Sequence, residues 1–219
     1  DNNICVRIVH YKEEEYMCGR FSVDIDDKEL LHRFPNHNVQ PFQKITNFAP
    51  TMELPIFLEK DVINMKWGLI PHWAKDSTFA SKLINARGET LLDKASFKDL
   101  VDTQRCLVIS NGFYEWDSKS KKPYFIHSKD NPLMNYCGLY SIWMDNNFQS
   151  VLTFTIITIE ANNTLSKIHH RMPVILDEGN ETKWLDSNNN FQSVRELIKP
   201  IDDGKIEMSQ IDLNYNNNN

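Results

Sequence analysis

Several features that mark whole classes of protein are missing from this 219-residue sequence. No apolar run approaches the roughly 20 residues that a membrane-spanning helix requires, and no secretory signal opens the chain. The cysteines, which are Cys5, Cys18, Cys106 and Cys137, include no Cys-X-X-Cys pair and follow no regular spacing. A disulfide framework and contact with a membrane are therefore not expected, and reduced thiols in the nucleus or cytoplasm are the favoured interpretation.

An excess of positive charge is missing as well. The 24 lysines and arginines face 30 aspartates and glutamates, which gives a formal net charge of −6. Proteins that coat nucleic acid nonspecifically are usually basic, so this balance argues against that class. It leaves room for a basic groove on an otherwise acidic surface.

The length and the hydrophobic content of 41% indicate one ordinary globular domain. A chain of this size can bury a core without a metal ion or a disulfide. We expect an N-terminal extension over residues 1–17, one catalytic domain over 18–213 and an asparagine-rich tail over 214–219. The tail is too polar to order itself by burial.

Hydrophobic periodicity and turn residues predict many short strands and a few helices. Helices are expected over 26–34, 89–101 and 191–198, with a short one around 163–167. Strands are expected over 5–10, 56–58, 62–67, 106–110, 113–116, 124–127, 134–143 and 152–159. This order favours an α+β fold with a largely antiparallel, barrel-like β core and flanking helices.

The first segment with chemical potential contains Cys18. A thiol beside Gly19 and Arg20 could form an accessible thiolate in an electropositive setting. A free cysteine is more often a small core residue, so the segment alone does not decide between the two interpretations.

The second segment contains Asn85, at a predicted junction of a loop and a helix. Asn85 could cap that helix, and Arg87 could pair with Glu89. The functional alternative makes Asn85 an amide that orients a carbonyl group, and makes Arg87 a bidentate phosphate contact.

The third and fourth segments contain Glu115 and His169. Along a strand, Glu115 shares a face with Phe113, and an acid enclosed by aromatic rings should have a raised pKa. The alternative is a glutamate that reaches water from an edge strand. The pair His169 and His170 before Arg171 suggests acid–base chemistry beside an anion contact. Adjacent histidines rarely bind one ion together, so neither a metal site nor a cofactor is expected.

The aromatic segment 67–73 is a softer feature. Trp67 is expected in the core. Trp73, which follows a proline, could stack on a base, although ordinary packing explains a lone tryptophan equally well.

Taken together, these segments resemble the SOS-response-associated peptidase (SRAP) family, over about residues 17–185. The matching stretches are 18–21 (CGRF), 47–50 (NFAP), 67–73 (WGLIPHW), 84–87 (INAR), 105–107 (RCL), 111–116 (NGFYEW) and 168–173 (IHHRMP). The family's usual elements have no clear counterpart over 205–214, so a strand could be missing there.

The resemblance implies covalent capture of abasic sites in single-stranded DNA, by a monomer that needs no cofactor. An N-terminal cysteine would form a thiazolidine with the sugar aldehyde, through its α-amine and its thiol. Catalysis would rest on four residues, namely Cys18, Asn85, Glu115 and His169. Contacts to the DNA would come from Arg20, Pro50, Trp73, Arg87 and Arg171.

The position of Cys18 departs from the family pattern, because sixteen residues precede Met17. With these residues attached, the nitrogen of Cys18 is an amide and cannot attack an aldehyde. Three explanations are open. Met17 is the true start, the chain cleaves itself before Cys18 by an N-to-S acyl shift, or the protein binds DNA without crosslinking.

Other functional classes remain as alternatives. A thiol peptidase acting on other proteins is one, although Gly19 and Arg20 do not match the papain-like signature. A noncovalent reader of single-stranded or modified DNA is another. A purely structural role is the third, and the joint presence of the four predicted catalytic residues disfavours it.

Overall fold

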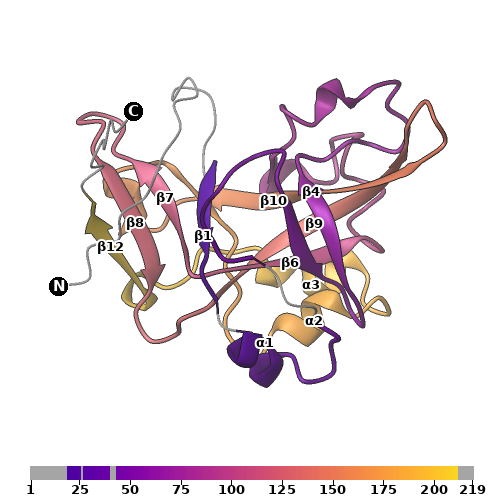
Figure 1. Ribbon diagram of the computed structural model, residues 1–219. Coiled ribbons are helices and arrows are strands. Elements are labelled where there is room, and N and C mark those ends of the chain that lie inside the picture. Colours follow the sequence, from indigo (N-terminus) through magenta and orange to yellow (C-terminus); the bar gives the residue numbers. More distant parts are fainter. Residues whose placement is uncertain (1–18, 26, 40–42, 212–219) are drawn as a thin grey trace, which may run out of the picture.

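The structure is a computed structural model that describes residues 19–25, 27–39 and 43–211. Cys18, the expected extension over 1–17 with its strand over 5–10, and the tail over 214–219 lie outside this part of the chain. Within the described part, two β-sheets form the body of the protein, and short helices lie along one side (Figure 1).

The larger sheet closes into a barrel. Its strands follow the order β10-β4-β3-β6-β9, and β9 pairs again with β10. These neighbours are antiparallel except for β10 and β4, which run parallel. The expected α+β fold with a largely antiparallel, barrel-like core is confirmed. The barrel strands are β3 (Glu53–Phe57), β4 (Val62–Trp67), β6 (Arg105–Ser110), β9 (Met134–Met144) and β10 (Ser150–Glu160).

Two short strands extend the barrel wall along β10. Thr158 of β10 pairs with Arg87 of β5 (Asn85–Arg87) in parallel and with Pro173 of β11 (Arg171–Pro173) in antiparallel register. Because one strand residue has one neighbour on each side, β5 and β11 lie on opposite edges of β10.

The second sheet is antiparallel and follows the order β12-β8-β7-β1-β2. In Figure 1, β1 lies between the labelled barrel strands and strands β7, β8 and β12. β12 occupies the region over 205–214 where a strand could have been missing. The strands are β1 (Arg20–Val23), β2 (Ile45–Phe48), β7 (Gly112–Trp116), β8 (Pro123–Ser128) and β12 (Ile206–Gln210).

Aromatic side chains join the two sheets in one core. Trp67 is fully buried, as expected, and its indole N–H donates to the carbonyl of Ile84 at 2.9 Å. Its ring lies 4.9 Å from that of Phe21 on β1 and stacks at 6.3 Å on Phe154 of β10. Buried rings of this size each contribute about 1.5–3 kcal/mol through burial alone, so this cluster fixes β1 against the barrel.

The helices are short and only partly as expected. Helices over 26–34 and 191–198 are confirmed by α1 (Asp27–Arg33), and by α3 (Phe191–Val194) with its 3-10 continuation η4 (Arg195–Leu197). The short helix around 163–167 is η3 (Leu165–Lys167), and α2 (Glu181–Leu185) was not expected. The remaining 3-10 turns are η1 (Ser77–Phe79), η2 (Gly88–Thr90) and η5 (Asp203–Lys205).

The helix predicted over 89–101 is wrong. The chain there forms η2 and then separate turns, in which the amide of Phe97 bonds to Lys94 and the amide of Leu100 bonds to Phe97. Asn85 accordingly lies on a strand, β5, and does not cap a helix. The buried side chains of Phe97, Leu100 and Val101, which lie three and four residues apart, imitate helical spacing without a continuous hydrogen-bond ladder.

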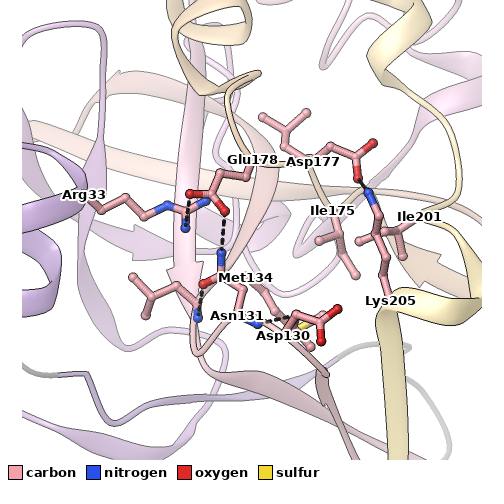
Figure 2. A pocket seen from close by; sticks show the side chains of 12 residues that line it. Arg33, Asp130, Asn131, Met134, Ile175, Asp177, Glu178, Ile201 and Lys205 are labelled. Atoms are coloured by element: carbon pink, nitrogen blue, oxygen red, sulfur yellow. Dashed lines mark hydrogen bonds and ion pairs between the residues drawn. The ribbon is translucent and has the colours of Figure 1, made fainter.

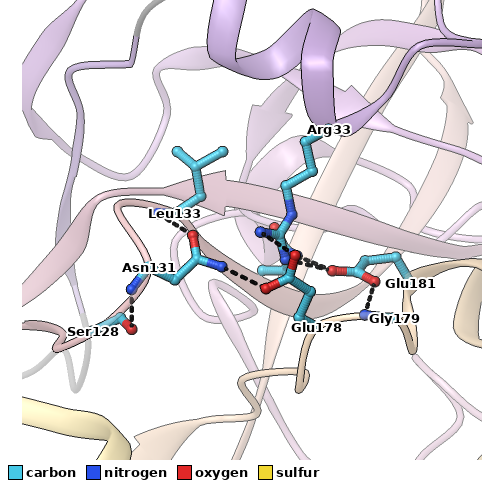
Figure 3. A network of polar contacts seen from close by, with 8 residues as sticks. Arg33, Ser128, Asn131, Leu133, Glu178, Gly179 and Glu181 are labelled. Carbon is cyan, nitrogen blue, oxygen red and sulfur yellow. Dashed lines mark hydrogen bonds and ion pairs between the residues drawn. The ribbon is translucent and has the colours of Figure 1, made fainter.

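Polar contacts fix the helices to one another and to the sheets. Arg33 of α1 donates to Glu181 of α2 at 2.7 Å and lies 3.6 Å from Glu178. Asn131 donates to Glu178 at 3.2 Å, and the amide of Gly179 donates to Glu181 at 2.7 Å (Figure 3). This network joins α1 and α2 to the loop between β8 and β9.

Candidate active site

The centre of the candidate site is a direct contact between Glu115 and His169. Glu115 is a buried residue of β7, and His169 follows η3 just before β11. The Nε2 atom of His169 lies 3.3 Å from Oε1 of Glu115. Two residues 54 positions apart in the sequence (169 − 115) are therefore joined.

The loop that carries His169 is fixed from two sides. The amide of His169 donates to the carbonyl of Leu165 at 3.0 Å, which closes the turn of η3. The amide of Ser118, just after β7, donates to the carbonyl of Ile168 at 3.0 Å. The strand that bears Glu115 thus also anchors the loop that bears His169.

Both polar groups of the Arg171 backbone face Nδ1 of the His169 imidazole, the N–H at 3.1 Å and the C=O at 3.2 Å. In the neutral tautomer that carries its proton on Nε2, Nδ1 accepts from this N–H. The Nε2 proton of that tautomer points to Glu115.

Burial lowers the pKa of His169 below that of an ordinary histidine. The backbone of Arg171 partly opposes this shift, while the positive charges of His170 and Arg171 add to it. The His170 ring, which is exposed, lies 4.6 Å from the His169 ring. The lowered pKa favours the neutral form of the imidazole in its contact with Glu115.

Of the two other predicted catalytic residues, the structure describes Asn85 and does not describe Cys18. Asn85 is half-buried on β5, in parallel register with Ile156 of β10. Cys18 lies outside the described residues; the chain enters the second sheet two residues later, at Arg20 of β1, and Arg20 pairs with Tyr114 of β7.

The predicted DNA contacts other than Arg171 are at least partly accessible. Arg20 donates to Asn47 of β2 at 3.3 Å, and Arg87 at the end of β5 is exposed. Pro50 is half-buried in the turn between β2 and β3. Trp73 is 46% exposed and meets the ring of Phe79 edge-on at 5.3 Å. One aromatic face near a turn is the kind of surface on which a base can stack.

Arg171 is buried and its guanidinium is engaged inside the protein. Its Nη1 and Nη2 atoms donate to the two carboxylate oxygens of Glu89 at 2.5 and 2.9 Å. Nη2 also donates to the carbonyl of Thr158 at 2.7 Å. Glu89 is thus the partner of Arg171, and not of Arg87, with which the sequence allowed a local pair. The expected phosphate contact of Arg171 stays a prediction, and it requires the Glu89 carboxylate to make room.

Glu89 was not among the residues predicted for the site. Glu89 lies two residues beyond the matching stretch over 84–87, and its proximity to Arg87 suggested only a local pair. Its partner lies 82 residues away (171 − 89), so no local pattern could have indicated it.

Neither a metal site nor a membrane span is found where the structure can be described. No group of three or more histidine, cysteine, aspartate or glutamate side chains there is placed to hold a metal ion. No helix in the same residues has the length and apolar character needed to cross a membrane. Cys106 and Cys137 are free and buried.

A separate cavity of about 170 Å³ lies beside the helix network (Figure 2). It shares no lining residue with the site around Glu115 and His169. Its two cations are already neutralised, since Lys205 contacts Asp177 at 2.5 Å and Arg33 contacts Glu178 and Glu181. Nothing in this lining indicates a particular ligand.

The fold and the site together define an α+β barrel protein with a buried carboxylate against a half-buried imidazole. The sequence profile of the family described as SOS response associated peptidase (SRAP) matches residues 17–218. The chain belongs to this family.

Relatives and solved structures agree with this assignment. The abasic site processing protein YoqW of Bacillus subtilis is 35% identical over 206 residues, which cover 89% of this chain and 92% of that protein. The abasic site processing protein HMCES of Gallus gallus is 36% identical over 172 residues, 66% of this chain and 51% of that protein.

A crystal structure of a Bacteroides thetaiotaomicron protein matches with a TM-score of 0.83 and 28% identity, over 89% of this chain and 92% of that one. A Bordetella bronchiseptica protein matches with a TM-score of 0.78 over 90% of this chain and all of that one; at 19% identity it shows the fold alone.

Proposed function

We propose that this protein processes abasic sites in single-stranded DNA and that it does so by forming a covalent bond through Cys18. The observation that carries the proposal is the contact of Glu115 with His169, because Glu115 lies on β7, which pairs with β1, and β1 begins two residues after Cys18. The relatives named as abasic site processing proteins support the same substrate for this chain.

The proposed bond is a thiazolidine ring. The α-amine of an N-terminal Cys18 adds to the aldehyde of the ring-opened sugar, and loss of one water gives an imine. The thiol then adds to the imine carbon, and its proton passes to the nitrogen. The α-amine and a cysteine thiol both have ordinary pKa values of roughly 8, so both are partly nucleophilic at physiological pH.

The pair of Glu115 and His169 supplies proton transfer for these steps. Glu115 accepts and returns protons at the amine during addition and loss of water. His169, whose lowered pKa favours the neutral imidazole, exchanges a proton with the sugar oxygen as the ring opens. Asn85 orients the sugar or its aldehyde through its side-chain amide. Enclosure of Glu115 keeps the exchanged proton out of bulk water.

The DNA strand is held by charge and by stacking. Arg20 and Arg87 contact phosphates, and Pro50 and Trp73 shape a kink in the strand. Two arginines can provide this groove on a protein whose net charge is −6. Binding through phosphates should weaken as salt is raised, because counterions are released on binding.

The chemistry requires a free α-amine on Cys18. We propose that the residues before Cys18 are absent from the active protein, either because synthesis starts at Met17 and this methionine is then removed by hydrolysis, or because the chain cleaves itself. In the second case the thiol of Cys18 attacks the Met17 carbonyl, and water hydrolyses the resulting thioester. The released segment leaves with the new carboxylate.

A denaturing gel tests the proposal. The chain beginning at Cys18 and the 219-residue chain are each incubated with a single-stranded oligonucleotide that carries one abasic site. We expect the first to give an adduct that survives denaturation, and Cys18→Ala to give none. Glu115→Gln should slow adduct formation while leaving DNA affinity within a few-fold. Salt-sensitive binding without any adduct would instead identify a noncovalent reader.

Cleavage of unrelated peptides by the same preparation, without an adduct, would identify a peptidase that acts on other proteins. A lower mass for the 219-residue chain, equal to the chain from Cys18, would support self-cleavage. A stable 219-residue mass and no adduct from either form would refute the crosslinking proposal.

A further inference from the structure

The contacts around Arg171 have a consequence for His169 that reaches beyond DNA binding. The Arg171 residue is 8% exposed, and its Nε atom is buried without a hydrogen-bond partner among the described residues. A buried cation is tolerated when a carboxylate and further acceptors compensate it. Here Glu89 provides the carboxylate in a bidentate contact, and the carbonyl of Thr158 provides the additional acceptor.

The backbone of the same arginine faces one nitrogen of His169 with both of its polar groups. Its N–H lies 3.1 Å from Nδ1 and its C=O lies 3.2 Å from Nδ1. When the imidazole is neutral, Nδ1 accepts from the N–H. When the imidazole is charged, Nδ1 carries a proton and donates to the C=O. One residue therefore offers a partner to each protonation state of His169.

We propose that Glu89 and Arg171 form a positioning pair, which holds the Arg171 backbone in place and so sets the orientation and the tautomer of His169. This inference rests on the proposed function for its catalytic meaning. It assigns Glu89 a role that does not require contact with DNA, and it gives Arg171 a role besides any phosphate contact. Neither residue is proposed to touch the reacting atoms.

The effect of Glu89 and Arg171 on His169 can be measured through the charges that surround the imidazole. Glu115 faces Nε2 from β7, and His170 and Arg171 are neighbours in the chain. On the elements packed against the loop, Lys167 of η3 is exposed and Asp117 after β7 is bonded to the amides of its own turn. Glu89 neutralises Arg171, so its removal exposes His169 to an uncompensated positive charge. This change lowers the pKa of His169 further.

Glu89 is a practical position to change because its side chain is 48% exposed. Glu89→Gln keeps the size of the side chain and removes its charge. Arg171→Lys keeps the charge and removes the fork that contacts Glu89 and Thr158. Glu53→Gln, at an exposed glutamate of β3, is the matched control.

The test is a pH titration of the protein labelled with ¹⁵N in its histidines, followed by NMR. His169→Gln assigns the His169 signals. For the wild type we expect the neutral ring to be protonated on Nε2. For Glu89→Gln we expect a titration midpoint at lower pH and a second tautomer, while Glu53→Gln matches the wild type. For Arg171→Lys we expect a mixture of tautomers.

The rate of adduct formation by chains that begin at Cys18 is measured in parallel. Glu89→Gln should slow it about tenfold, within the range that positioned acid–base groups contribute. The limb of the pH–rate profile that reports His169 should move with the NMR midpoint. If Glu89→Gln lowers only the melting temperature and leaves the tautomer and midpoint unchanged, the pair is merely structural and the inference is overturned.

Failure of the proposed function is distinguishable from failure of this inference. A wild type that forms no adduct defeats the proposed function. The tautomer and the midpoint of His169 still decide whether Glu89 and Arg171 position the imidazole, because neither readout depends on DNA.

Discussion

Arg105 offers the sharpest test of how the structure is held together. It belongs to a segment that matches the SRAP family, yet the structure gives it no place near Glu115 and His169. It is 5% exposed, and its guanidinium lies 5.6 Å from the centre of the Trp184 ring. All five of its N–H groups donate to backbone carbonyls at 2.6–2.8 Å, those of Val101, Asp102, Trp184, Asp186 and Asn189.

The effect of Arg105→Met follows from these contacts. The carbonyls of Trp184 and Val101 are buried and lose their partner, at about 1–3 kcal/mol each. The other three carbonyls are partly buried and can be rehydrated. The removal of a buried cation offsets part of the loss, so we expect a net destabilisation of about 2–5 kcal/mol. For a domain of this size that corresponds to a fall in melting temperature of about 5–15 °C.

Urea unfolding followed by tryptophan fluorescence measures this difference, since Trp184 is fully buried in the folded state. Arg195→Met is the control, because Arg195 is exposed on η4 and its loss should cost less than about 0.5 kcal/mol. If Arg105→Met were no more destabilising than Arg195→Met, the buried hydrogen bonds of Arg105 would not hold α2 against β6.

Three further predictions concern the site and its surroundings. Gly112→Ala places a Cβ atom 2.4 Å from the carbonyl oxygen of Ile126 and 2.6 Å from the Phe125 ring. Thermal unfolding should therefore show a free energy of unfolding that is lower by about 1–3 kcal/mol. An unchanged melting temperature would contradict the tight approach of β7 and β8.

Because the folded pKa of His169 is lowered, its unfolded state binds the proton more tightly, and this residue's contribution to stability decreases as pH falls below about 6.5. Unfolding free energies of His169→Gln should lack that decrease, and an identical pH dependence in both proteins would refute the assigned shift. Trp73→Ala should change the free energy of unfolding by less than about 0.5 kcal/mol, because the side chain is exposed. It should weaken binding of single-stranded DNA by about 1–3 kcal/mol, as measured by fluorescence anisotropy of the labelled DNA. Equal affinities would show that Trp73 does not contact the DNA.

The long strands of the barrel could be predicted because each carries enough residues to show a pattern. β4 was expected over 62–67 and is Val62–Trp67, and β9 and β10 extend the expected ranges by one to two residues at their ends. The pieces that were missed are short. β5 and β11 have three residues each and exist because they pair with β10, which is a tertiary effect that no local periodicity contains.

The same limit applies to the site. Glu115 and His169 could be proposed from residue type and from the family resemblance, and the structure joins them. The partner of Glu89 could not be found, because a glutamate near Arg87 has an obvious local explanation and Arg171 comes into reach only when β11 docks on β10. Burial decides that pairing, since the enclosed guanidinium of Arg171 needs a carboxylate more than the exposed one of Arg87 does.

The most direct measurement of the central proposal is an intact mass spectrum. The chain beginning at Cys18 is incubated with a single-stranded oligonucleotide that contains one abasic site, and the mixture is denatured before analysis. A thiazolidine predicts one species whose mass is the sum of protein and DNA less one water, stable without a reducing agent. Unaltered masses of protein and DNA, from a protein shown to be folded, would contradict it.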